Sequence, residues 1–135
     1  MIRRPPRSTQ GVSSAASDVY KRQDLREANL AEADLRRAIF DNADLEGADL
    51  SGANLRDASL KRANLMKAAL DGADLRGAKM IKARLGFSNL QGARLDGTDM
   101  RGIRGKYAVW RDANWWDAEM DDSLRKALAK KWPRQ

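Results

Sequence analysis

Large apolar residues recur at every fifth position over most of the chain. From residue 25 to residue 100 the series is unbroken, and a small residue, alanine in all but two cases, lies two positions before each member from residue 30 onward. Asp, Asn, Lys or Arg fill most of the remaining positions. The series consists of Leu25, Leu30, Leu35, Phe40, Leu45, Leu50, Leu55, Leu60, Leu65, Leu70, Leu75, Met80, Leu85, Leu90, Leu95 and Met100.

A period of five fits neither regular secondary structure. In an α-helix, five residues advance by about 500°, so the apolar residues would spiral around every side. In a flat strand, residues five apart point to opposite faces. A chain that turns by about 90° after each five-residue unit keeps the large and the small residue inside, and its coils of about 20 residues stack at the sheet spacing of about 4.8 Å. We therefore predict an all-β stack of square coils.

Glycine recurs two positions after the large residue, where the chain has to turn. Glycine adopts positive φ without steric cost, so these positions are expected to be turn residues of that kind. The glycines in this position are Gly47, Gly52, Gly72, Gly77, Gly92, Gly97 and Gly102.

The tandem Ala-(Asp/Asn)-Leu-x-x units, such as Ala43-Asp44-Leu45 and Ala53-Asn54-Leu55, resemble those of the pentapeptide repeat family. The resemblance covers residues 24 to about 122. It implies a right-handed quadrilateral β-helix, which over this length has about four to five coils. It also implies a protein that binds partners through a rigid surface.

The first 23 residues lack the period of five and are rich in Ser, Arg and Pro. The stretch RRPPRST followed by SSAASDVYKRQ resembles a translated sequencing adapter. We expect residues 1–23 to be disordered and foreign to the native protein, whose own N-terminus is then missing, so that the chain is a piece of a larger protein. A native basic tail that binds nucleic acid or an anionic membrane is the alternative. The charged residues are Arg3, Arg4, Arg7, Lys21 and Arg22, with Asp18.

The pattern changes near the C-terminus. Gly105 takes a large-residue position, after which tryptophans take the next two. Asp121-Asp122-Ser123 then precedes a segment whose apolar residues are spaced by four, and Pro133 ends it. This spacing predicts a short α-helix within residues 123–135.

We expect this helix to cover the last coil and hide its unpaired backbone edge. The alternative is a homodimer contact through the same end. The candidate cap or dimer residues are Trp110, Trp115, Trp116, Leu124, Leu128 and Trp132.

Outward charges are unevenly distributed over the four faces that a 20-residue coil would have. The face of Phe40, Leu60, Met80 and Met100 carries most of the excess of basic residues in the repeats, against Asp41 and Asp99. This surface is the candidate interaction site, with an ordinary solvated face as the alternative. It consists of Lys61, Arg62, Lys79, Lys82 and Arg101.

The residue types argue against catalysis. The chain has no His and no Cys, which removes imidazole and thiolate chemistry and the metal sites built from them. Its carboxylates lie at positions where Asp and Asn interchange, and a neutral amide cannot perform acid–base work. We expect no enzyme activity, metal or cofactor. We also expect no membrane span and a cytoplasmic location.

Three functions remain. The first is a protein-interaction scaffold with an unknown partner. The second is a topoisomerase-binding DNA mimic, as in the quinolone-resistance members of the family. Those members present a strongly acidic rod, whereas residues 24–104 here carry 14 basic and 13 acidic residues. The third is binding of an anionic partner through the basic face. We expect a protein rather than a nucleic acid as the partner.

Overall fold

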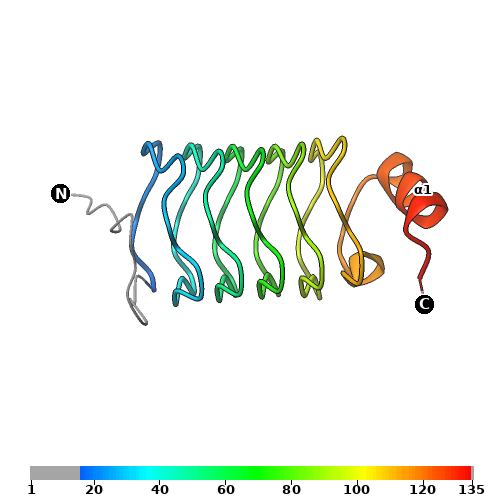
Figure 1. The fold of residues 1–135 in the computed structure, drawn as a ribbon, viewed down its shortest axis with the longest axis horizontal. Coiled ribbons are helices and arrows are strands. Elements are labelled where there is room, and N and C mark those ends of the chain that lie inside the picture. The colour runs from blue at the N-terminus through cyan, green and yellow to red at the C-terminus, as the bar shows by residue number, and fades with distance from the viewer. Residues whose placement is uncertain (1–15, 135) are drawn as a thin grey trace.

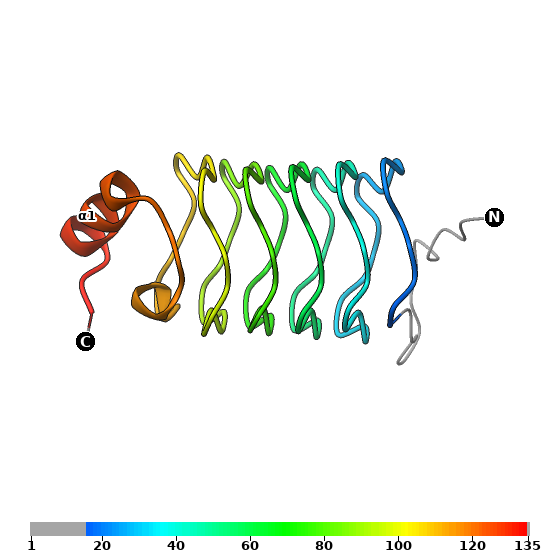
Figure 2. The same cartoon turned by 180° about the vertical axis from the view of Figure 1, so that it is seen from behind.

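The computed structural model describes residues 16–134, and these form a stack of coils closed at one end by a short helix (Figure 1). The elements are a 3-10 helix η1 (Trp115–Asp117) and an α-helix α1 (Asp122–Lys131). The view from behind shows the same stack, with α1 at the end opposite the first coil (Figure 2). The predicted solenoid and C-terminal helix are therefore both observed.

The coils are joined by isolated parallel β-bridges between residues twenty positions apart, and no longer strand is formed within residues 16–134. Each coil thus contains four of the five-residue units, and the four units define four faces. One complete line of bridges joins Val19 to Ile39, Ile39 to Ser59, Ser59 to Lys79, Lys79 to Asp99 and Asp99 to Glu119.

Backbone hydrogen bonds explain how such short bridges hold the stack. The Leu25 N–H donates to the Asp44 carbonyl of the next coil at 2.7 Å, and the Glu27 N–H donates to the Glu46 carbonyl at 2.9 Å. The Ala28 N–H donates back to the Leu25 carbonyl at 3.0 Å and closes the turn between two faces. With its backbone groups paired in this way, the chain can surround an interior that is apolar apart from Ser88 and Thr98.

The turns have the positive φ that the glycine pattern predicts. All seven glycines named above have φ between 65° and 72°. Thirteen further residues, from Ser17 to Asp112 at the same five-residue spacing, adopt positive φ without being glycine. Such a conformation costs a non-glycine residue about 1–2 kcal/mol, so the stack compensates for this strain. Gly77 has an additional reason to be glycine, because a Cβ there would collide with the Asp57 carboxylate.

The interchange of Asp and Asn before each large residue has a local cause. The side-chain oxygen at this position accepts a hydrogen bond from the backbone N–H two residues later. Arg76 N–H donates to Asp74 Oδ1 at 3.2 Å, and Met66 N–H donates to Asn64 Oδ1 at 3.1 Å. A carboxylate and an amide oxygen serve equally well in this turn. These residues therefore stabilise corners of the fold.

The structure differs from the expected start of the repeats at Asp24. Tyr20 is 1% exposed, and its ring stacks on Phe40 of the next coil at a centroid distance of 5.2 Å. The tyrosine lies one five-residue step before Leu25 and fills the same kind of inward position. Asp18 replaces the usual alanine and accepts a hydrogen bond from Tyr20 Oη at 3.0 Å. Residues 16–23 thus form the beginning of the first coil, and the rest of the segment expected to be disordered, 1–15, lies outside the described residues.

Gly105, where the pattern breaks, lies beside the Trp110 ring. A Cβ on this residue would lie 3.5 Å from Trp110 Cζ2 and 4.0 Å from Ile103 Cδ1, which are ordinary contact distances. The indole ring is only 2% exposed, whereas Gly105 is partly exposed. Trp110 is thus the large buried side chain at this break in the repeat.

The C-terminal helix begins slightly earlier than predicted. It spans Asp122–Lys131, with Asp121 as the residue before it, rather than beginning at Ser123. The Asp121 side chain does not cap the helix; its Oδ2 instead accepts the Gly102 N–H at 3.1 Å. This bond ties the start of the helix to the last coils.

Candidate interaction surfaces

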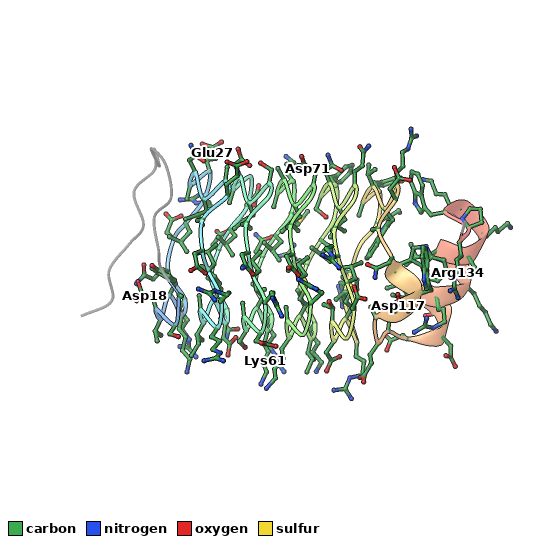
Figure 3. All side chains as sticks on the ribbon, turned by 90° about the horizontal axis from the view of Figure 1, so that it is seen from below. Asp18, Glu27, Lys61, Asp71, Asp117 and Arg134 are labelled. Carbon is green, nitrogen blue, oxygen red and sulfur yellow. The ribbon has the colours of Figure 1, made fainter. Side chains whose placement is uncertain are left out.

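The residues of the basic strip, which we define as Lys61, Arg62, Lys79, Lys82 and Arg101, lie on neighbouring coils of one edge. All five are exposed. Figure 3 shows Lys61 on the edge opposite Glu27 and Asp71. The 20-residue coil brings these residues together, because Lys82 lies about one coil after Lys61 and Arg101 lies about one coil after Lys79. Their role as an interaction surface stays a prediction.

Not every member of the basic strip is free to bind a partner. The Arg101 guanidinium donates to both oxygens of Asp99, at 2.9 and 2.7 Å. This pair raises the pKa of Arg101 and lowers the pKa of Asp99, chiefly through the side-chain hydrogen bonds. Lys61, Arg62, Lys79 and Lys82 make no ion pair within residues 16–134, which leaves four unpaired cations in the strip.

The adjoining first face contains a group of residues that sequence analysis missed. Phe87 and Tyr107 are 56% and 59% exposed, and their rings lie 5.0 Å apart on successive coils. Lys106 Nζ lies 5.2 Å from the Tyr107 ring centroid. Phe87 by itself is an ordinary exposed apolar residue. The sequence contains one signal that the two aromatic residues form a pair. They are 20 residues apart, which is the length of one coil.

The C-terminal candidates lie where α1 packs against the last coil. Trp115 Nε1–H donates to the Trp132 carbonyl at 2.8 Å, and the Arg125 guanidinium donates to the Ala118 carbonyl at 2.7 Å. Leu128 is buried together with two of the tryptophans, whereas Leu124, Trp116 and Trp132 are partly exposed. The helix therefore covers the end of the stack (Figure 1). A homodimer contact at this end stays a prediction.

A cavity of about 500 Å³ lies between α1 and the last coil. The Lys131 ammonium lies 5.6 Å from the Trp132 ring, and the Arg134 guanidinium lies 5.2 Å from the Trp116 ring. The cavity is thus aromatic with cationic walls, and these cations already stack on its rings. It is lined by Trp110, Arg111, Asp112, Ala113, Trp115, Trp116, Lys131, Trp132 and Pro133.

Residues 16–134 contain no group of three or more acidic, His or Cys side chains that could hold a metal ion. Among the same residues, no helix has the length and apolarity needed to cross a bilayer. The cytoplasmic location inferred from the sequence stays a prediction.

Three Asp–Arg pairs of the corners make stability depend on pH. In each, the guanidinium hydrogen-bonds the carboxylate two residues before it and lowers the pKa of that carboxylate. Arg76 is the least exposed of the three arginines, and its Nη2 lies 2.7 Å from Asp74 Oδ2. The pairs are Asp34–Arg36, Asp74–Arg76 and Asp99–Arg101.

Replacing Asp74 with asparagine is expected to make stability less sensitive to acid. An unfolded aspartate titrates near pH 3.9. Because the folded pKa is lower, the pair stabilises the fold fully above that value and loses its effect as pH falls through the folded pKa. Asparagine still accepts the Arg76 N–H but cannot titrate. Thermal melts between neutral and acidic pH should show a smaller fall in Tm for the variant, and an unchanged fall would contradict the assignment.

With this geometry established, the chain can be compared with known proteins. The model of the family described as pentapeptide repeats matches residues 24–57, 43–80 and 68–104, with 8 copies. The chain belongs to the pentapeptide repeat family, as the sequence indicated, and it forms a β-helix solenoid. A comparison with curated proteins gives no match.

Several solved structures are similar to this chain. HetL, a pentapeptide repeat protein involved in heterocyst differentiation regulation from the cyanobacterium Nostoc sp. strain PCC 7120, is 30% identical over 81% of the chain, with a TM-score of 0.37. The chain spans only 62% of the length of HetL. Rfr23 from the cyanobacterium Cyanothece 51142 is 25% identical over 82% of the chain and 84% of its own, with a TM-score of 0.38.

A third similar structure is the plasmid-mediated fluoroquinolone resistance protein QnrB1. One form of it is 15% identical, covers 88% of this chain and 87% of its own, and has a TM-score of 0.34.

Proposed function

We propose that this chain is a non-catalytic scaffold that binds an acidic protein surface through its basic strip. The observation that carries the proposal is the row of four unpaired, exposed cations on successive coils. A solenoid holds such a row in fixed positions, because its core and backbone bridges leave the outward side chains free. Charge complementarity of this kind steers association and selects partners.

The shape of the proposed binding surface follows from the coil. Four five-residue units per coil and the family resemblance support a right-handed quadrilateral β-helix, with flat faces and the basic strip along one edge. Of the four unpaired cations, Lys61 and Arg62 lie on one coil, and Lys79 and Lys82 lie on the next. An acidic helix or loop that runs parallel to the stack would therefore meet two cations on each of two successive coils, which are about 4.8 Å apart.

The charge distribution does not favour a DNA mimic as a second function. A mimic of duplex DNA needs a dense and continuous negative surface. Here the edge of the basic strip is positive, and four corner aspartates are paired with the arginine two residues later.

The proposal is tested by quantitative capture of proteins from source-cell extract. The bait is the full chain, with Lys61, Arg62 and Lys82 reversed to glutamate in one variant. A matched control reverses Arg94, Lys126 and Lys130, which gives the same net charge with the basic strip intact. We expect a defined protein to be retained by the unmodified chain and the control and lost by the strip variant. Equal loss by both variants, or retention abolished by nuclease, would overturn the proposal.

A further inference from the structure

One face of the solenoid carries charge that changes sign along its length. We define the first-face row as the outward residues that parallel bridges join from coil to coil. Read from the N-terminal end, the row consists of two carboxylates, one amide and two guanidiniums, so its charge is antisymmetric about the central amide. Its members are Asp24, Asp44, Asn64, Arg84 and Arg104.

The corner that follows this face changes sign in the same direction. Glu27 and Glu46 lie on the first two coils beside Arg26, Lys67 lies on the middle coil, and Lys106 lies on the last. Figure 3 shows Glu27 at the N-terminal end of this edge. In the C-terminal half, the face and the corner together contain three cations and no carboxylate, because the remaining corner residues there are glycine, phenylalanine and tyrosine. The face is therefore acidic at one end and basic at the other.

We propose that a second copy of this chain docks antiparallel on this face, with a twofold axis through Asn64. The twofold rotation reverses the direction of the row, so that Asp44 of one copy faces Arg84 of the other. The same rotation sets Asp24 against Arg104. An isologous interface needs a surface that is complementary to itself, and antisymmetric charge satisfies that requirement. A parallel arrangement would instead oppose like charges.

The exposed aromatic pair supports the same arrangement. Exposed aromatic side chains are typical of protein interfaces, and Phe87 and Tyr107 account for two of the three large exposed apolar residues within residues 16–134. Both Phe87 and Gly47 lie on the corner that follows the first face. Phe87 lies one coil after the level of the twofold axis, and Gly47 lies one coil before that level. The twofold axis therefore places the exposed phenylalanine of each copy over a glycine of the other, where no side chain occupies the space.

The contacts within one chain show which cross-pair should contribute most. Asp24 is already held by Arg26, whose Nε lies 2.9 Å from Asp24 Oδ1. Asp44 accepts Asn64 Nδ2 at 3.2 Å and lies 3.9 Å from Arg26, which orients it without a close ion pair. Arg84 makes no ion pair with any residue of 16–134. The pair Asp44–Arg84, formed twice across the axis, is thus the main electrostatic contact.

The opposite edge of the face limits the position of the contact. Lys61 and Arg62 lie at the level of the twofold axis and would face their own copies. Lys67, in the middle of the corner that carries Phe87, lies at the same level and would also face its own copy. The favourable contacts are therefore limited to the two halves of the face on either side of the axis. Because the interface depends on charge, the dimer is expected to dissociate as ionic strength rises.

Sedimentation equilibrium of the purified chain tests the proposal without any other protein, so its result is independent of partner binding by the basic strip. At low ionic strength we expect a monomer–dimer equilibrium. Arg84→Asp should raise the dimer Kd by about tenfold or more. Arg94→Asp is the matched control: it makes the same charge change at an exposed outward position half a coil away, on the opposite face, and should leave Kd unchanged.

A charge swap distinguishes the proposed arrangement from general self-association. Asp44→Arg alone should weaken the dimer, and the double variant Asp44→Arg/Arg84→Asp should restore it, because both cross-pairs are rebuilt with reversed sign. Circular dichroism melts identify any variant that fails to fold, and Asp44→Asn then replaces Asp44→Arg as the weakening change. A monomer at all concentrations, equal weakening by Arg84→Asp and Arg94→Asp, or a folded double variant that stays monomeric would overturn the proposal. A dimer insensitive to Arg84 would overturn it as well and would favour the C-terminal end as the contact.

Discussion

Replacing Trp110 with alanine is expected to lower the free energy of unfolding by about 3–5 kcal/mol, the usual cost of removing a buried tryptophan. The indole is 2% exposed and lies against Gly105, at whose position all the preceding coils have a leucine. Urea unfolding followed by circular dichroism measures the loss without relying on tryptophan fluorescence.

Further variants show whether the contact between Gly105 and Trp110 accounts for the loss of stability. Trp116→Ala removes a partly exposed indole from the same end and should cost clearly less. Gly105→Leu should destabilise the unmodified chain by about 1–3 kcal/mol through overpacking. When Trp110 is replaced by leucine, Gly105→Leu restores the regular repeat. In that background Gly105→Leu should lower the free energy of unfolding by less, or raise it. Equal costs for Trp110→Ala and Trp116→Ala would show that Trp110 has no special role.

Replacing Leu65 with alanine is expected to destabilise the chain by about 2–5 kcal/mol. Leu65 is completely buried in the middle of the stack, between Leu45 and Leu85 of the neighbouring coils. In a solenoid, stability is a sum over repeats and their interfaces, so a central cavity weakens two interfaces at once.

The matched control is Leu25→Ala at the first coil. Leu25 is equally buried, at 1% exposure, but within residues 16–134 only Leu45 stacks on it along this face. The nearest-neighbour account therefore expects a clearly smaller loss than at Leu65, measured by urea unfolding under the same conditions. If both variants lose the same free energy, the stack behaves as a single cooperative core rather than as a row of coupled coils.

Features repeated in every unit could be predicted from the sequence, because the same local interaction is present many times. The inward leucines, the glycine turns and the exchange of Asp with Asn are of this kind. The period also assigns each residue of the basic strip to a face, although the use of this strip as an interaction surface stays a prediction. The ion pair between Arg101 and Asp99 could not be predicted, because the residue spacing does not determine the side-chain geometry on which this pair depends.

Features that occur once were harder to predict. The beginning of the first coil was missed because residues 1–23 resemble a translated sequencing adapter and were expected to be disordered, although Tyr20 keeps the five-residue spacing. The exchange at Gly105 was visible only as an irregularity, since its reason is the position of one indole ring. The pairing of Phe87 with Tyr107 requires a comparison of residues on different coils, whereas each alone has an ordinary explanation.

The offset of twenty residues between bridged positions also bears on how such a chain can evolve. Loss or duplication of five codons keeps every large residue inside, but it rotates all later residues by one face and gives the surface a new arrangement of charges. Loss or duplication of twenty codons changes the length and leaves the faces aligned. Slippage during replication of the repetitive gene can therefore produce new binding surfaces in single steps while the interior stays intact.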